Sequence, residues 1–197
     1  RPVADGAGLA QVLGDARINA VCVGPGLGTG DAARDLVAGV LGVVRVGVEP
    51  RPTVLDADVL TILSRDPALF AALHPACVLT PHAGEFARLF PDIAAKLDAP
   101  ATKGPAYSKV DATREAAARA GCVVLYKGPD TVIADPSGRC AINSAHYDRA
   151  APWLATAGSG DVLAGFITGL LARGFAPMQA AETAAWLHVE CALSFGP

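Results

Sequence analysis

A glycine-rich segment in the last third of the chain has residue types suited to phosphoryl transfer. It reads Gly158-Ser159-Gly160-Asp161 and opens a run in which a helix is expected. Backbone amides at a helix start bind anions, and the glycines let the backbone approach a ligand closely. The Asp161 carboxylate could act as general base toward a hydroxyl that attacks a phosphoryl group held by the same loop. It would also suit the first turn of a helix on structural grounds alone, so both roles stay open.

A second glycine loop, Gly24-Pro25-Gly26-Leu27-Gly28-Thr29-Gly30, lies between an expected strand and an expected helix. A tight turn with positive φ explains such glycines without any ligand. The glycines of segment 28–33, with the acidic residue Glu49 further on, also match the residue spacing of a dinucleotide-binding fingerprint. However, Asp31 would place a carboxylate beside the pyrophosphate, and the loop is longer than the turn of that fingerprint. The chain has no G-x-x-x-x-G-K-[ST] motif, which excludes a P-loop ATPase.

Further polar residues follow expected strands, at the edge where parallel α/β sheets bind ligands. His82 could contact a ligand there, or it could be a surface histidine at a helix start. Glu85, three residues later, could support that helix start or hold a metal-bound water, and we favour the structural role. Asp56 and Asp58 end another strand and could face the same edge or cap a helix.

Short β-branched runs alternate with Ala- and Leu-rich stretches, which is typical of α/β folds with a mainly parallel sheet. Strands are expected at 18–23, 53–56, 76–79, 122–126, 131–134 and 139–142. Helices are expected at 8–16, 31–41, 58–63, 66–73, 85–90, 109–120, 160–173 and 177–193. Residues 91–107 and 144–157 are expected to be irregular, and 135–138 to form a turn between the last two strands. No repeat, coiled coil or linker divides the sequence, which favours one domain.

The composition excludes several classes of protein. The 197 residues are 52% apolar and 18% charged, with a net charge of −3. The balance of 16 basic against 19 acidic residues leaves no basic face for a phosphate backbone, so we expect no nucleic acid as a partner. No apolar run reaches the roughly 18 residues of a membrane helix, and the first residues do not form a basic region followed by a long apolar core. We therefore expect a cytoplasmic protein without membrane contact.

The five cysteines are predicted to be small core residues. They lie at positions 22, 77, 122, 140 and 191, mostly within apolar strings and without C-x-x-C spacing. Free cysteine is among the most buried residue types, and an odd number argues against a complete disulfide framework. Metal-ligand or nucleophile roles are not expected for them.

Five segments taken together resemble the ADP/ATP-dependent NAD(P)H-hydrate dehydratase family of the ribokinase-like superfamily. In the order of the family they are VGPGLG at 23–28, VLDAD at 54–58, LTPHAGEFARL at 79–89, KGPDT at 127–131 and LATAGSGDVLAG at 154–165. The Thr-Pro-His-x-Gly-Glu sequence joined to Ala-Gly-Ser-Gly-Asp is the specific part. The resemblance implies a three-layer α/β/α fold with a mainly parallel central sheet. It also implies one domain over 1–197 that is incomplete at its N-terminal end, since the family carries a further strand-helix unit ahead of the Gly24 loop.

The activity implied by the resemblance is repair of damaged nicotinamide cofactors. Hydrated NADH or NADPH would be phosphorylated on its C6 hydroxyl by ADP or ATP, and elimination would release phosphate and AMP or ADP. Asp161 would be the catalytic base. The resemblance assigns the hydrated substrate to Gly24, Gly26, Gly28, His82 and Asp161. It assigns the activating nucleotide to Lys127, Gly128, Pro129, Asp130, Thr131, Gly158, Ser159 and Gly160.

The resemblance also implies further components of the system. Mg²⁺ would bridge the phosphates of the nucleotide, although no ligand set for it can be identified in the sequence. Relatives form homo-oligomers, often tetramers, and an NAD(P)H-hydrate epimerase acts on the same damaged cofactor as a fused or separate partner.

Two features leave alternatives open. Residues 144–153 replace a short Gly-Asn turn of the family, and His146 or Trp153 there could touch a ligand or cover the edge of the core. A glycine loop ending in Asp also serves a small-molecule alcohol kinase of the same superfamily, of the hydroxymethylpyrimidine or thiazole type. A nucleotide-binding fragment without catalysis is the third hypothesis, because the chain begins at Arg1 without the front unit of the family. The Thr80-Pro81-His82 segment favours the dehydratase.

Overall fold

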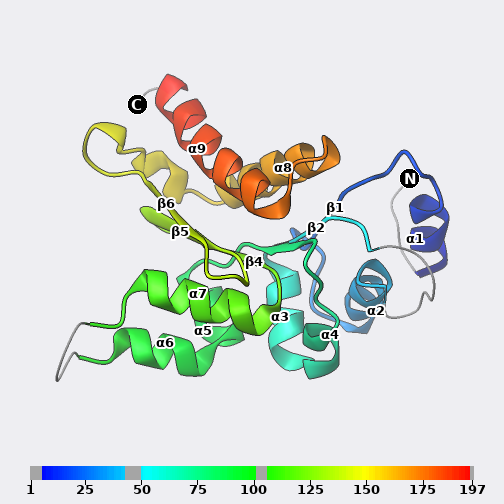
Figure 1. Ribbon diagram of the computed structural model, residues 1–197. Coiled ribbons are helices and arrows are strands. Elements are labelled where there is room, and N and C mark those ends of the chain that lie inside the picture. The colour runs from blue at the N-terminus through cyan, green and yellow to red at the C-terminus, as the bar shows by residue number, and fades with distance from the viewer. Residues whose placement is uncertain (1–5, 43–49, 101–105, 196–197) are drawn as a thin grey trace.

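A mixed sheet forms the centre of the molecule. The computed structural model describes residues 6–42, 50–100 and 106–195 (Figure 1). Within this part of the chain, six strands lie in sequence order across the sheet. They are β1 (Val21–Val23), β2 (Thr53–Leu55), β3 (Cys77–Leu79), β4 (Val123–Tyr126), β5 (Asp130–Ala134) and β6 (Cys140–Ser144). The first four are parallel and β4 to β6 form an antiparallel meander, which confirms the mainly parallel sheet.

Helices cover both faces of the sheet, as Figure 1 shows, and give three layers. On one face lie α8 (Ser159–Ala172) and α9 (Pro177–Phe195). On the other lie α3 (Asp58–Arg65), α4 (Pro67–Ala71), α5 (Ala83–Leu89), α6 (Pro91–Asp98) and α7 (Lys109–Ala120). Near β1 are α1 (Gly6–Leu13) and α2 (Asp31–Val40), and two short 3₁₀ segments precede α8, η1 (Tyr147–Arg149) and η2 (Pro152–Ala155).

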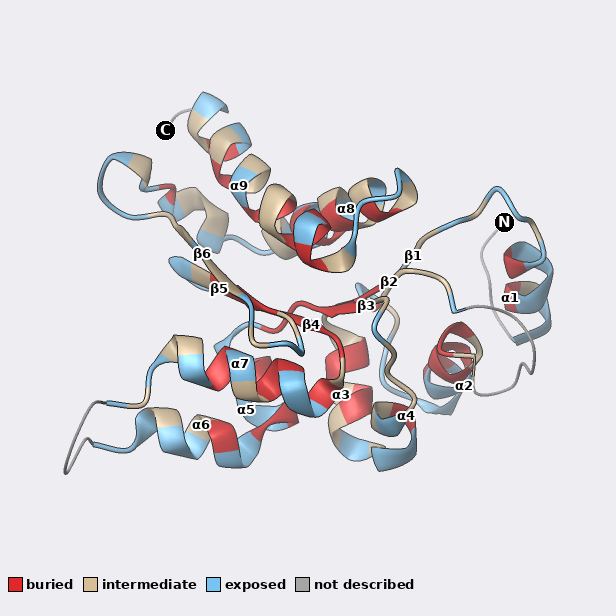
Figure 2. Cartoon of the chain, viewed as in Figure 1, coloured by how far each residue is buried: buried red, intermediate tan, exposed pale blue. Residues whose placement is uncertain are grey.

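Two hydrophobic clusters hold the layers together, one on each face of the sheet. The central strands are apolar on both faces, so consecutive residues such as Val54 and Leu55 are fully buried (Figure 2). Leu55 belongs to the cluster under α3 to α7, and Val54 to the cluster under α8 and α9. In the first cluster the Phe86 ring stacks on Tyr126 with centroids 4.1 Å apart. The sheet is therefore fixed from both sides close to its carboxyl edge.

The expected elements are present with shifted ends, and one expectation was wrong. Residues 91–107 were expected to be irregular, but α6 occupies Pro91–Asp98. Proline suits the first position of a helix, Ile93 is fully buried, and Asp92 forms a two-bond pair with Arg119 at 2.6 and 2.7 Å. Within 144–157, also expected to be irregular, the two 3₁₀ segments form.

The cysteine prediction was wrong for part of the set. Cys77 and Cys122 are buried and Cys140 is intermediate, but Cys22 and Cys191 are exposed. Cys22 is the exposed central residue of the short edge strand β1, and Cys191 lies on the exposed side of the last helix. Apolar neighbours in sequence therefore did not place these two thiols in the core. Successive residues of a strand point to opposite faces, and successive residues of a helix point in different directions around its axis.

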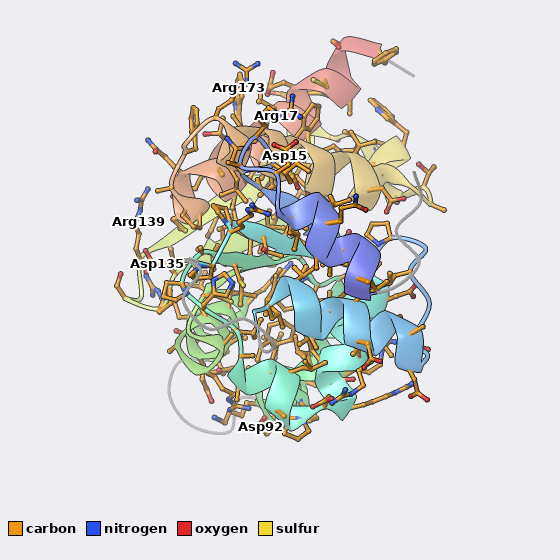
Figure 3. All side chains as sticks on the ribbon, turned by 90° about the vertical axis from the view of Figure 1, so that its right-hand side faces the viewer. Asp15, Arg17, Asp92, Asp135, Arg139 and Arg173 are labelled. Atoms are coloured by element: carbon orange, nitrogen blue, oxygen red, sulfur yellow. The ribbon has the colours of Figure 1, made fainter. Side chains whose placement is uncertain are left out.

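Charged side chains on the outside of the molecule form several ion pairs. Figure 3 labels Asp92 at the bottom of the molecule, Arg139 at its left edge, and Asp15 and Arg17 in its upper part. Asp15 and Arg17 are 2.6 Å apart, and Arg139 lies 2.7 Å from Glu182. Exposed pairs of this kind contribute about 0–1 kcal/mol each. Among the helices of the described ranges, none is long and apolar enough to span a bilayer.

Candidate functional site

A buried ion pair lies where strands β2 and β4 end. Asp56 follows β2 directly, Lys127 follows β4, and Lys127 Nζ is 2.9 Å from Asp56 Oδ1. Glu85, in the first turn of α5 after β3, places its Oε2 3.8 Å from the same ammonium. The Asp56 side chain is 2% exposed, that of Glu85 10% and that of Lys127 18%. We call these three residues the Lys127 cluster, and it shows that Asp56 faces the sheet edge.

The first turn of α8 lies against this cluster. Gly158 precedes the helix with φ +89°, a conformation that favours glycine. A Cβ on Gly160 would stand 3.3 Å from Lys127 Nζ and 3.9 Å from Asp56 Oδ2, so the helix backbone passes beside the ion pair. The Ser159 hydroxyl donates to the Leu154 carbonyl at 2.6 Å and ties the helix start to η2. Asp161 follows in the same turn and is exposed.

The Gly24 loop packs on the other side of Asp56. Gly24 has φ +138°, and a Cβ there would lie 1.7 Å from the Asp56 carbonyl oxygen. The position therefore requires glycine for structural reasons. Gly28 donates its N–H to Asp58 Oδ2 at 2.8 Å, so the Asp58 carboxylate holds the loop from the first turn of α3. Between the two carboxylates Ala57 has φ +49°, which is strained backbone for a residue with a Cβ.

His82 caps the start of α5, as its position in the sequence suggested, and it also lies beside the cavity described below. Its Nδ1 accepts hydrogen bonds from the N–H groups of Gly84 at 3.0 Å and Glu85 at 3.4 Å. Glu85 Oε2 accepts from the His82 N–H at 2.8 Å, which completes a reciprocal capping box. This confirms the structural role favoured for Glu85. The His82 side chain is 55% exposed and its ring lines the cavity described next.

A cavity of about 770 Å³ opens beside these groups. Its polar wall contains His82, Lys127, Gly128, Pro129, Thr131, Ser159 and Gly160. Its apolar wall contains Leu154, Leu163, Ala185 and Val189, from η2, α8 and α9. Pockets of roughly 300–1,000 Å³ with a few polar groups on apolar walls are typical small-molecule sites. Seven residues assigned by resemblance are therefore brought to one cavity.

Other assigned residues lie outside this cavity. Among the described residues that line it, Gly24, Gly26, Gly28, Asp130, Gly158 and Asp161 are not included. Asp161 lies in the first turn of α8, and this helix packs against β1 and β2. The assigned residues occupy two regions that meet at the Lys127 cluster.

The structure also answers the alternatives left for residues 144–153. The Trp153 indole N–H donates to the Ala192 carbonyl at 3.1 Å, so this ring packs against α9 at the edge of the core. His146 lines the cavity, with Nε2 3.5 Å from Asp130 Oδ2. His188 lines it too, and burial lowers the pKa of its imidazole. Sequence reasoning missed His188, because it lies within an apolar helical pattern that carries no signal of a ligand site.

The arrangement of strands and helices defines a three-layer α/β/α protein with a mainly parallel sheet. A ribokinase-like superfamily protein from Enterococcus faecalis, 23% identical, has this fold with a TM-score of 0.69 over 95% of this chain and 60% of that chain. Residues 5–196 match the family described as NAD(P)H-hydrate dehydratase. The chain belongs to the NAD(P)H-hydrate dehydratase family.

Several relatives carry names from this family. A bifunctional NAD(P)H-hydrate repair enzyme of Mycobacterium tuberculosis (strain CDC 1551 / Oshkosh) is 43% identical over 84% of this chain and 30% of its own length. An ADP-dependent (S)-NAD(P)H-hydrate dehydratase of Neisseria meningitidis is 42% identical over 87% of this chain and 53% of its own. The Bacillus subtilis ADP/ATP-dependent enzyme, co-crystallised with ATP/Mg²⁺, is 30% identical with a TM-score of 0.65 over 90% of this chain and 56% of that chain. The chain thus spans about a third to a half of the length of these curated relatives.

The contact between Gly24 and Asp56 generates a stability prediction. We expect Gly24→Ala to lower the free energy of unfolding by about 3 kcal/mol, because strain at positive φ adds to a steric clash with backbone. Gly30→Ala, in the same loop but with nothing within 4 Å of the added Cβ, should cost less than about 1 kcal/mol. Urea unfolding of both variants measures the difference. Equal effects at the two positions would contradict the close approach described.

Proposed function

We propose that the chain binds ADP or ATP in the cavity and uses its terminal phosphoryl group to dehydrate hydrated NADH or NADPH. The observation that carries this proposal is the meeting of the α8 start, the 127–131 turn and His82 around one cavity at the carboxyl edge of the sheet. The relatives named above support the reaction. Their chains are longer than this one.

The nucleotide fits the cavity side of the Lys127 cluster. The apolar wall of η2, α8 and α9 suits a flat base, and the turn 127–131 supplies polar backbone beside it. The first turn of α8 would bind the terminal phosphates through its amides and its positive dipole. Lys127 Nζ, close to Gly160, adds a positive charge next to that position.

The hydrated substrate would bind on the other side, at the Gly24 loop, and would reach His82 at the border between that region and the cavity. Asp161 would take the proton of the C6 hydroxyl of the substrate. The hydroxyl oxygen would then attack the terminal phosphoryl group of the nucleotide. The Gly158 to Gly160 amides would stabilise the charge on that group during transfer. Phosphate is a better leaving group than hydroxide, so the C6–O bond then breaks and a proton leaves C5. The products are NADH or NADPH, phosphate, and AMP from ADP or ADP from ATP.

Mg²⁺ belongs to this proposal as the counter-ion of the phosphates. Within the described ranges, no group of three His, Cys, Asp or Glu residues is arranged to hold a metal ion. The carboxylates of Asp56 and Glu85 lie nearest to the α8 start, but they face Lys127. They would hold Mg²⁺ through water, with phosphate oxygens as direct ligands. The ion would supply neutralisation of the phosphate charge.

We also propose the setting in which the protein works. A cytoplasmic homo-oligomer, such as a tetramer, remains our expectation. The Ile142 and Trp186 side chains, 59% and 51% exposed, offer apolar surface for such contacts. The bifunctional name of the M. tuberculosis relative supports a partner activity, for which we propose an NAD(P)H-hydrate epimerase.

The role of Asp161 is tested by removing its basicity. Hydrated NADH lacks the absorbance of NADH at about 340 nm, so ADP-dependent recovery of that band reports the reaction. We expect Asp161→Asn to lower kcat by about 10²-fold or more while the affinity for ADP stays unchanged. Asp31→Asn, at another exposed first-turn carboxylate after a glycine loop, is the matched control and should keep full activity.

Two outcomes would count against this function. An unchanged kcat in Asp161→Asn would remove Asp161 from the mechanism. A stable phosphorylated alcohol, with no recovery of the NADH band by the unmodified protein, would favour the alcohol kinase instead.

The contact of His82 with the substrate is tested by a variant that keeps its cap. Asparagine is a strong N-cap residue, so His82→Asn should leave the free energy of unfolding within about 0.5 kcal/mol, whereas His82→Ala should cost about 1 kcal/mol. Loss of the ring should raise KM for hydrated NADH about tenfold and leave KM for ADP unchanged. If His82→Asn has normal kinetics for both, the histidine is only a helix cap.

A further inference from the structure

Lys109 reaches the turn 127–131 from the far side of the cavity wall. Its Nζ donates hydrogen bonds to the Asp130 carbonyl at 2.7 Å and to the Lys127 carbonyl at 3.1 Å. The same ammonium lies 4.2 Å from the centroid of the Tyr126 ring, within range of a cation–π contact. Lys109 is not among the described residues that line the cavity. Any effect it has on a ligand must therefore act through the turn.

The position of this lysine is unfavourable by local criteria. It is the first residue of α7, where the helix dipole disfavours a positive charge. Burial lowers the pKa of the ammonium to about 8, although the nearby Asp130 carboxylate acts in the opposite direction. The helix start needs no lysine, because Ser108 and Asp111 already cap it reciprocally. A residue that opposes local preferences in this way points to a requirement elsewhere in the fold.

That requirement is visible in the carbonyl groups of the turn. Four consecutive carbonyl oxygens, those of residues 127 to 130, accept hydrogen bonds from within the protein. The Thr131 hydroxyl donates to Gly128 at 3.0 Å, and the Ala145 N–H donates to Pro129 at 2.8 Å. Lys109 donates the other two bonds, to the carbonyls of Lys127 and Asp130. A single ammonium group thus holds the first and the last of these four carbonyls.

Gly128 also lies against the Lys109 ammonium. A Cβ on Gly128 would stand 2.7 Å from Lys109 Nζ, so a larger residue at this position would clash with the ammonium. At the other end the Lys127 N–H donates to the Pro81 carbonyl at 2.8 Å, next to His82. This backbone bond fixes Lys127, and with it the cluster formed with Asp56, without the help of Lys109.

We propose that Lys109 is a positioning residue that holds the turn 127–131 in the conformation with which it binds the activating nucleotide. The inference rests on the proposed function for the identity of that ligand. It assigns Lys109 no contact with the nucleotide and no step in the reaction.

The test combines a ligand-free measurement with a binding measurement on the full protein. Lys109→Met removes the donors, Lys109→Gln keeps an N–H donor on a shorter side chain, and Lys109→Arg keeps the charge. Lys96→Met is the matched control, because Lys96 lies 5.9 Å from the Tyr107 ring and 2.8 Å from Glu115 but does not contact the turn. Backbone hydrogen exchange over 127–131 is measured without ligand, and the affinity for ADP by calorimetry.

In Lys109→Met we expect exchange over 127–131 to speed up about tenfold and the Kd for ADP to rise about tenfold, because two carbonyls of the turn lose the donor that holds them. At saturating ADP, kcat and KM for hydrated NADH should stay within about threefold, since the hydroxyl and its base are untouched. Lys109→Arg should recover ADP affinity to within about threefold, and Lys109→Gln should fall between the two. Lys96→Met should change neither exchange in the turn nor Kd.

Several results would overturn the proposal. Unchanged exchange in the turn of Lys109→Met, or of Lys109→Gln if the Met variant does not fold, would show that Lys109 does not hold it. Faster exchange with an unchanged Kd for ADP would show that the hydrogen bonds of Lys109 to the turn do not contribute to nucleotide binding. If the unmodified protein binds neither ADP nor ATP, the proposed function fails, and the exchange data identify this as a separate failure.

Discussion

The ion pair between Asp56 and Lys127 is the contact on which the arrangement of the site depends. The two residues are 71 positions apart in sequence and follow β2 and β4, on either side of β3. Both side chains are largely removed from water, and removing one partner of such a pair typically costs about 3–5 kcal/mol. Glu85 adds a second carboxylate beside the ammonium. The pair therefore fixes three strand ends relative to one another, where surface pairs such as Arg139 with Glu182 do not.

The two sides of this pair explain how one site could hold two ligands. Gly24 packs against the Asp56 backbone on one side, and Gly160 brings the start of α8 beside Lys127. The cavity lies on the side of the 127–131 turn and does not include Asp161, which lies in the first turn of α8, the helix that packs against β1. A phosphoryl group at the helix start would lie between a nucleotide and a hydroxyl. In the proposed reaction the protein contributes mainly position and electrostatic stabilisation, as in other phosphoryl transfers.

The sequence predicted the sheet and most helices, because β-branched runs, caps and glycine loops are local signals. The segments assigned to the site, such as 127–131, were indicated by the family resemblance. The reciprocal cap of His82 and Glu85 is a spacing of three residues and could be recognised. The helix at Pro91–Asp98 could not be recognised from the sequence, because it is short and begins with a proline. Its stability comes from packing and from the ion pair of Asp92 with Arg119. Lys109 was missed because its two acceptors are 18 and 21 residues away in sequence, and only the fold brings them together.

A double-mutant cycle on Asp56 and Lys127 tests the central claim most directly. Unfolding free energies are measured for Asp56→Asn, Lys127→Met and the double variant, with Arg139→Met and Glu182→Gln as the cycle for an exposed pair. The structure predicts a coupling of about 2 kcal/mol or more for the buried pair, and less than about 1 kcal/mol for the exposed pair. Additive effects of Asp56→Asn and Lys127→Met would show that the ion pair does not hold the strand ends together, and would contradict this account of the site.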